Sequence, residues 1–317
     1  MARRSLIFAL SALVVSATAA FAQDAMLIDK HDITPYAARK LIDACFAQAA
    51  SAGFPIALAV TDSAGYLVSY EATTPEMRHT GVTAQLKAKT AAKFRRSTAE
   101  LYDRTNKNIN RAAEWMGYFP VPGGYPIVVN DEVVGAMGAG SAGLSGGKDE
   151  GCVENAIKAV FGEGKSPPPA SEQAVLFTRK TMTPKAARTL VDACAAYAGE
   201  KKYTALGISV VDPDGTLLSF QGTEGALASA LDTAQLKATT AAHWQRPTEE
   251  LWDRVNNQVN RAPEFIGDFA QPGGFPIWIG KDMVGAIGAG GALGNQDDEC
   301  AKAAIKAVFP NATVTRP

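Results

Sequence analysis

Several signals are scarce or absent in this chain of 317 residues. It has three histidines and four cysteines, and no Cys-x-x-Cys or Cys-x-x-His spacing of the kind that structural zinc sites use. Basic and acidic residues nearly balance, with 31 Lys and Arg against 32 Asp and Glu, and no basic run follows the N-terminus. We therefore expect neither a nucleic acid nor a membrane surface as partner. No Ser-His-Asp or Cys-His constellation of a nucleophilic enzyme can be placed.

Long hydrophobic runs are missing as well. The apolar run from Leu6 to Val15 follows Arg3 and Arg4, and it is shorter than the about 20 residues that span a bilayer. It leads to Ala20-Phe21-Ala22, which places small residues where a signal peptidase needs them. The pattern predicts a cleaved signal peptide over residues 1–22 and a periplasmic mature chain that starts at Gln23. An uncleaved membrane anchor is the alternative.

Internal repetition dominates what remains. Shifting the sequence by about 150 residues aligns whole phrases, which is the mark of a duplication. The matched phrases are Thr34-Pro35 with Thr183-Pro184, Ala84–Ala88 with Ala234–Ala238, Pro122–Gly124 with Pro272–Gly274, Val134–Ala136 with Val284–Ala286, and Ala156–Phe161 with Ala304–Phe309. We expect domains over residues 23–163 and 174–317, joined by a linker over 164–173 whose three prolines favour an extended chain.

The same elements can be read in each copy. In the first, Thr34 and Pro35 predict the N-cap and first residue of a helix that runs to Ser51. The further predicted elements are strands over 55–61 and 66–70, helices over 82–94 and from 97, a hairpin turning at 130–131, and a helix over 149–161. This order predicts an α+β fold of two tandem domains, each a central, mainly antiparallel sheet with helices packed against it.

The cysteines are distributed evenly, with one in the first and one in the last predicted helix of each copy. They are Cys45, Cys152, Cys194 and Cys300. An even count in an exported protein favours disulfides, and the repeat favours one bridge inside each copy because the same geometry then serves twice. Four buried free thiols are the alternative.

A lysine interrupts the apolar face of one predicted helix in each copy. Lys87 falls on the arc of alanines between residues 84 and 92, and Lys237 repeats it. A buried ammonium is costly unless it is paired, so each lysine either closes a salt bridge or meets an anionic ligand. We expect both lysines to face a pocket between the Pro-Gly-Gly loop and the glycine-rich stretch before the last helix.

Other residues near these lysines are candidates for ligand binding. Arg96 and Arg246 follow the lysine helix, where a cation also simply favours the helix dipole. The paired glycines of each Pro-Gly-Gly loop allow a close backbone approach to a ligand, but they also make turns. They are Gly123, Gly124, Gly273 and Gly274. The run from Gly135 to Gly140 lacks the parallel βαβ context of a dinucleotide site.

The histidines, His31, His79 and His243, are not repeated between the copies. His79, in the loop before the lysine helix, is the best candidate for a haem or metal ligand, and it would act in one copy only. A solvated loop histidine is the alternative.

Four phrases carry a family resemblance. They are Ala-Gln-Leu-Lys-Ala, Arg-Pro-Thr-x-Glu-Leu (residues 246–251; Ser97 replaces the proline at 96–101), Pro-Gly-Gly-x-Pro-Ile and Val-Gly-Ala-x-Gly. Together they resemble the GlcG/HbpS family of haem-binding and glycolate-operon proteins, which is also similar to the C-terminal domain of PduO corrinoid adenosyltransferases. The resemblance implies an α+β domain that self-associates through its helices and binds haem or a small metabolite.

Three functions therefore compete. The first is binding of haem or a related tetrapyrrole in the periplasm. The second is a small-carboxylate site, binding or catalytic, that uses Lys87 and Lys237. The third is a structural or accessory protein without a ligand. Because a duplication preserves a self-complementary interface, we also expect the two copies to pack as an internal pseudo-dimer.

Overall fold

The computed structural model describes residues 26–73, 78–141, 147–162, 176–292 and 295–317. The signal peptide and the linker predicted over 164–173 lie outside the described residues. The first copy contains β1 (Leu27–Ile33), α2 (Pro35–Ser51), β2 (Ala57–Asp62), β3 (Leu67–Ala72), α3 (Arg78–Phe94), α4 (Thr98–Asn106), α5 (Ala112–Trp115), β4 (Gly124–Val129), β5 (Glu132–Gly140) and α6 (Gly147–Phe161).

The second copy repeats this order element by element. It contains β6 (Leu176–Met182), α7 (Pro184–Lys201), β7 (Gly207–Val211), β8 (Leu217–Gly222), α8 (Ala228–Trp244), α9 (Thr248–Asn256), α10 (Ala262–Phe265), β9 (Gly274–Ile279), β10 (Asp282–Gly290) and α11 (Gln296–Val308). The predicted α+β class with two repeated halves is confirmed.

Each copy has a four-stranded antiparallel sheet, in the order β3-β2-β5-β4 in the first and β8-β7-β10-β9 in the second. Helices cover both faces. Ala57 and Ala59 of β2 pack under Ala84 and Ala88 of α3, while the alternate residues of β2 pack with α2 and α6 on the opposite face. This alternation follows the two-residue period of a strand, so a single strand serves two helical layers.

Local signals explain where the predicted elements begin and turn. Thr34 caps α2, since its side chain accepts a hydrogen bond from the Ala37 amide at 3.2 Å. The β4–β5 turn holds Asn130 and Asp131 at φ values of 49° and 64°, as a two-residue hairpin requires. The glycine run in β5 has a packing cause. A Cβ on Gly138 would overlap the Ala84 carbonyl and the Ala88 amide of α3.

Two kinds of element were not predicted. The short helices α5 and α10 follow α4 and α9, and the strands β1 and β6 precede the first helix of each copy and pair in a two-stranded sheet.

The compact units do not begin where the repeats do. One unit contains residues 31–178, and the other contains 179–317 together with the first described residues, up to Lys30. Within that second unit, Met26 and Leu27 pack on the core of the second copy. Lys30 and Arg179 both pair with the Oδ2 atom of Asp214 at 2.6 Å. The first part of β1, up to Lys30, thus belongs to the compact unit of the second copy.

Candidate functional site

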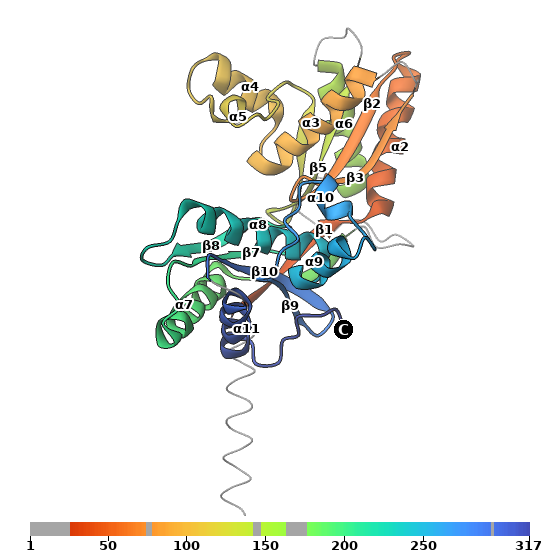
Figure 1. The fold of residues 1–317 in the computed structure, drawn as a ribbon. Coiled ribbons are helices and arrows are strands. Elements are labelled where there is room, and N and C mark those ends of the chain that lie inside the picture. The colour runs from red at the N-terminus through yellow and green to blue at the C-terminus, as the bar shows by residue number, and fades with distance from the viewer. Residues whose placement is uncertain (1–25, 74–77, 142–146, 163–175, 293–294) are drawn as a thin grey trace, which may run out of the picture. The chain divides into compact units, whose positions relative to one another are not determined.

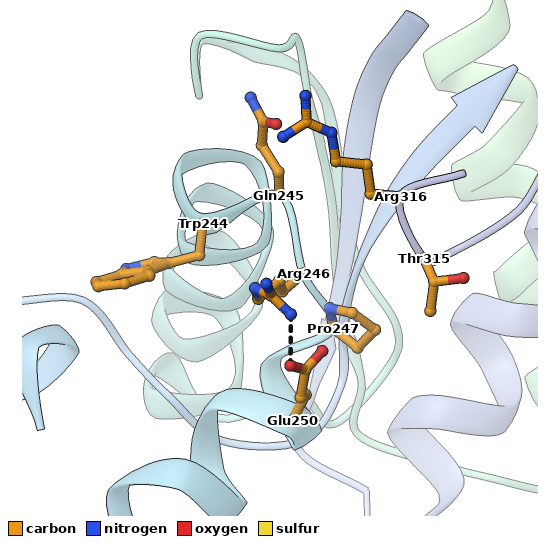
Figure 2. A pocket seen from close by; sticks show the side chains of 7 residues that line it. All are labelled: Trp244, Gln245, Arg246, Pro247, Glu250, Thr315 and Arg316. Carbon is orange, nitrogen blue, oxygen red and sulfur yellow. Dashed lines mark hydrogen bonds and ion pairs between the residues drawn. The ribbon is translucent and has the colours of Figure 1, made fainter. Parts of the chain in front are cut away.

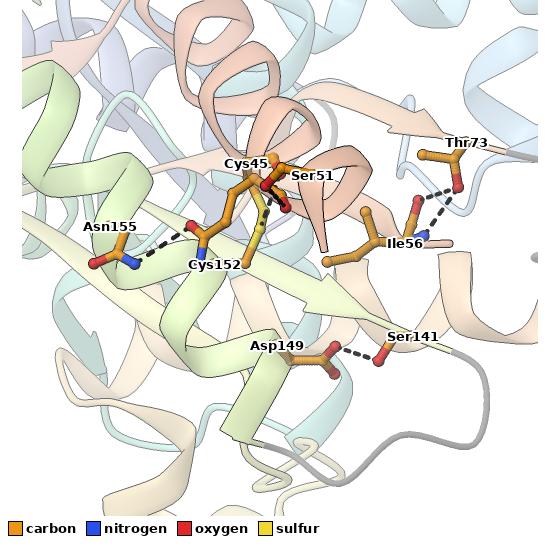
Figure 3. The surroundings of a disulfide bond; sticks show 9 residues. Cys45, Ser51, Ile56, Thr73, Ser141, Asp149, Cys152 and Asn155 are labelled. Atoms are coloured by element: carbon orange, nitrogen blue, oxygen red, sulfur yellow. Dashed lines mark hydrogen bonds between the residues drawn. A yellow bond between two sulfur atoms is a disulfide. The ribbon is translucent and has the colours of Figure 1, made fainter. Parts of the chain in front are cut away.

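Lys87 occupies the centre of the first copy. Its Nζ donates to the Ala139 carbonyl at 2.7 Å and to the Oδ2 atom of Asp149 at 2.8 Å. The other Asp149 oxygen accepts from the Ser141 hydroxyl at 2.6 Å (Figure 3). Both side chains of the ion pair are about one-twentieth exposed, at 6% and 5%. The lysine therefore ties α3 to the end of β5 and to the start of α6.

Lys237 repeats this geometry in the second copy. Its Nζ donates to the Ala289 carbonyl at 3.0 Å and to Asp297 Oδ2 at 2.8 Å. Asp297 also accepts from the Ala292 amide at 3.1 Å, where the first copy uses a serine hydroxyl. Asp149 and Asp298 each lie near the start of the last helix of their copy. The partner of Lys237 is Asp297, because the loop before α11 is shorter and shifts the alignment.

The Pro-Gly-Gly loops lie directly on these lysines. Gly123 and Gly273 have φ values of 115° and 118°. A Cβ on either would lie 2.9 Å from the neighbouring lysine Nζ, closer than a real Cβ can approach. The Gly124 amide donates to the Thr98 hydroxyl at 2.8 Å, and Gly274 does the same with Thr248 at 2.9 Å. Both glycine pairs thus lie on the lysines and cover the ion pairs, and the predicted ligand-binding pocket at these lysines stays a prediction.

The remaining polar candidates lie apart from the buried lysines. Arg96 and Arg246 pair with Glu100 and Glu250 one turn ahead, at 2.5 Å and 2.6 Å. Arg246 also lines a cavity of about 310 Å³. His79 is exposed in the first turn of α3. It lies eight residues before Lys87, or about 12 Å along the helix axis. The ligand roles of all these residues stay predictions.

Burial raises the pKa of three residues beside the buried pairs. Burial raises the pKa of Glu150, with a further contribution from Asp149. Burial also raises the pKa of Tyr125, and Glu150 adds to it. In the second copy, burial raises the pKa of Asp298, against the opposing effect of Lys302. The start of the last helix is therefore a crowded acidic region in both copies.

The disulfides join the first and last helices of each copy. Cys45 bridges to Cys152 with a Cα–Cα distance of 5.2 Å, and Cys194 to Cys300 with 5.0 Å (Figure 3). All four side chains are fully buried. The prediction of one bridge inside each copy is confirmed over four free thiols.

An apolar surface that was not predicted lies on the helical hairpins α4–α5 and α9–α10, from here on called the hairpins. Ile109, Trp115 and Met116, here called the first hairpin trio, are 63%, 81% and 65% exposed. The second hairpin trio lies 150 residues later, at Val259, Phe265 and Ile266, with exposures of 70%, 79% and 67%. Large exposed apolar side chains grouped on one segment are typical of an interaction surface. The signal available in the sequence was the retention of apolar residues at three equally spaced positions.

A cavity of about 380 Å³ adjoins the first hairpin. Tyr102 and Arg111 line it from the hairpin, and Pro120 and Val121 line it from the loop that leads to Gly123. In the described ranges, no cluster of three or more His, Cys, Asp or Glu side chains could hold a metal ion. No helix among the described residues is long and apolar enough to cross a membrane.

Comparison with known proteins identifies the repeated domain. A family profile described as "Haem degrading protein HbpS-like" matches residues 33–158 and again residues 182–306. The chain belongs to the HbpS-like family. It does so as two tandem copies, as the phrases of the sequence implied.

Solved structures resemble one copy at a time. A PduOC–haem complex is 24% identical, with a TM-score of 0.40, and the match covers 43% of this chain and 99% of that one. A double mutant of HbpS from Streptomyces reticuli is 29% identical, with a TM-score of 0.40 and coverage of 46% and 98%. Protein ORFY of Klebsiella pneumoniae is 26% identical, with a TM-score of 0.39 and coverage of 45% and 97%. A search of curated proteins gives no match.

Proposed function

We propose that this protein binds haem or a related tetrapyrrole in the periplasm. The observation that carries the proposal is the pair of exposed apolar trios, one in each copy of a domain whose family is described by haem chemistry. A tetrapyrrole is a wide, flat, mostly apolar ring, and it gains most of its binding energy by covering apolar surface.

The hairpins also supply groups for the polar edge of such a ligand. Arg111 lines the cavity beside the first trio, and guanidinium groups pair well with carboxylates such as the haem propionates. In the second copy, Arg261 lies over the Phe265 ring at 5.7 Å, so a cation again adjoins the exposed apolar side chains. In both copies an arginine paired with a glutamate, Arg111 with Glu114 and Arg261 with Glu264, adjoins the exposed apolar side chains, and a propionate would compete with that glutamate.

The disulfides support this compartment. Bridges at Cys45–Cys152 and Cys194–Cys300 form and persist in oxidising compartments and are rare in the cytosol. We therefore propose that the chain is exported, with residues 1–22 as the signal. Cell fractionation, with a thiol assay on the denatured mature protein, tests this. Recovery in the cytosol with free thiols would contradict it.

Haem titration of the full-length mature chain tests the ligand. We expect a saturable Soret shift with one haem for each copy. Trp115→Ser and Phe265→Ser should each weaken one of the two binding events by at least tenfold, because each removes the most exposed apolar group of its trio. Tyr66→Ser is the matched control, since Tyr66 is also an exposed aromatic, 47% accessible, but lies in the β2–β3 turn.

Two results would contradict this function. One is the absence of a saturable shift in the wild-type chain. The other is an unchanged titration in both hairpin variants while light scattering shows that an oligomer has dissociated. That second result would assign the trios to contacts between chains.

A further inference from the structure

A cavity of about 310 Å³ in the second copy lies where α8 ends and α9 begins (Figure 2). Arg246, Pro247 and Glu250 line it from this junction, and Thr315 and Arg316 line it from the C-terminal segment. Two backbone hydrogen bonds between Thr313 and Trp278 of β9, at 2.9 Å and 3.0 Å, hold that segment in place. The cavity wall is therefore fixed on both sides.

Positive charge exceeds negative charge around this cavity. Glu250 Oε1 lies 2.6 Å from Arg246 Nη1 and 3.5 Å from Arg254 Nη1. Arg316 adds a third guanidinium, which lies 5.9 Å from the centre of the Trp278 ring. In the described part of the chain Arg316 has no carboxylate partner. Two arginines, Arg246 and Arg316, thus line the cavity with one carboxylate, that of Glu250, which pairs with Arg246 and leaves Arg316 with capacity for another anion.

The first copy lacks two of these features. Arg96, Glu100 and Arg104 repeat the arginine–glutamate–arginine arrangement. However, the position 148 residues before Arg316, which is the spacing of Cys152 and Cys300, is Pro168, outside the described residues. Ser97 caps α4 by accepting a hydrogen bond from the Glu100 amide at 3.2 Å. Its counterpart Pro247 makes no side-chain cap on α9, so the amides there lack that acceptor.

We infer that this cavity is a binding site for a small organic carboxylate, present only in the second copy. Arg316 and Arg246 hold the carboxylate by charged hydrogen bonds, and the Pro247 ring borders its carbon skeleton. A volume of 310 Å³ lies at the lower end of the range for small-molecule sites, which restricts the ligand to a small metabolite. The site does not involve the hairpin trios, so it is independent of haem binding.

Calorimetric titration of the full-length mature chain with glycolate and with succinate tests the inference, with acetamide as the uncharged probe. We expect saturable binding of at least one of the two carboxylates at one site per chain, and no binding of acetamide. Arg316→Gln should weaken this binding at least tenfold, because it removes the unpaired guanidinium but keeps a polar side chain. Arg316→Lys, which keeps the charge, should restore part of the affinity.

The first copy provides the matched control. Arg96→Gln removes the counterpart of Arg246 and should leave carboxylate binding unchanged. The inference is overturned if neither carboxylate binds saturably, if two equivalent sites appear, or if Arg316→Gln binds like the wild type. A haem titration of Arg316→Gln should match the wild type, so failure of this site and failure of the haem proposal can be told apart.

Discussion

The two copies agree in their interiors and differ at their rims. The buried lysine–aspartate distance is 2.8 Å in both, and the bridged cysteine Cα atoms lie 5.2 Å and 5.0 Å apart. At the rim, Ser97 in the first copy corresponds to Pro247. Packing constrains an interior residue through every neighbour it touches, whereas a rim residue is constrained mainly by what it binds. Ligand differences between the copies should therefore lie at their rims.

Removing the disulfides should have the largest effect and should affect both copies equally. The bridges span 107 and 106 residues, so each should contribute roughly 4–5 kcal/mol in the chain-entropy model. We expect the Cys45→Ala/Cys152→Ala and Cys194→Ala/Cys300→Ala variants to lose similar stability in denaturant unfolding. A loss confined to one variant would break the equivalence of the two interiors.

The buried lysines should come next. Lys87→Met leaves Asp149 without its ion-pair partner, and breaking a buried pair in this way costs about 3–5 kcal/mol. Lys237→Met should cost about the same. Adding Asp149→Leu to Lys87→Met should restore much of the lost stability, because no uncompensated charge then remains.

The same lysine variants separate the two interpretations made from the sequence. If the lysines only close salt bridges, the folded fraction of Lys87→Met should keep its ligand affinity. A tenfold loss of affinity, about 1.4 kcal/mol, would instead assign the ammonium to an anionic ligand. Calorimetry below the unfolding midpoint of the variant gives this readout.

Features set by local chemistry or by the repeat were predictable from the sequence. Thr34 predicted the start of a helix. The even distribution of the cysteines between the copies favoured the two bridges that the structure contains. The partner of Lys87 was not found, because an acid such as Asp149 at a helix start is already explained by the helix dipole. Lys87 and Asp149 are 62 residues apart in the sequence, and only the tertiary fold brings Lys87 Nζ within 2.8 Å of Asp149 Oδ2.

Features that depend on distant chain segments escaped prediction. Arg316 forms part of a cavity because the C-terminal segment pairs with Trp278. No local sequence pattern predicts that pairing. Strand β1 also depends on a distant segment, because Leu27 packs on the core of the second copy and not on that of the first. The short helix α5 was missed because its four residues are too few to show a period.

Asp214→Asn should have an intermediate effect, and only on the second unit. Burial alone raises the pKa of Asp214, but Arg179 and Lys30 outweigh it and hold the pKa below its ordinary value. A lowered pKa means that this stability is present above the ordinary aspartate range and is lost as the pH falls through the folded pKa. We expect Asp214→Asn to cost roughly 1.5–3 kcal/mol at neutral pH.

Unfolding measured between neutral and strongly acidic pH checks both parts of this prediction. The wild type should lose the Asp214 contribution in acid, whereas the variant lacks it throughout. Ala64→Asn, at the corresponding position of the first copy, is the matched control and should not alter the pH dependence. An equal acid response of wild type and Asp214→Asn would remove the ion-pair explanation.

Asp298→Asn should have the smallest effect and the opposite sign. Burial raises the pKa of Asp298, and its Oδ1 atom accepts no hydrogen bond in the described part of the chain. A raised carboxylate pKa means that stability falls as the pH rises from the ordinary aspartate range through the folded pKa. Replacing the charge with an amide removes this loss. The gain is limited to about a few tenths of a kcal/mol at neutral pH, because the 3.6 Å contact with Lys302 disappears as well and exposed ion pairs are weak.

The corresponding residue of the first copy, Glu150, provides a comparison for Asp298. Glu150 occupies the position of Asp298, and burial raises its pKa too, but Glu150 is only half-buried whereas Asp298 is 5% exposed. Glu150→Gln should therefore stabilise the first copy in the same pH range and by less than Asp298→Asn stabilises the second. Calorimetric unfolding at pH 5 and pH 8 measures both variants. If Asp298→Asn instead destabilises the chain more at pH 8 than at pH 5, the carboxylate is a favourable partner of Lys302, and burial does not govern its titration.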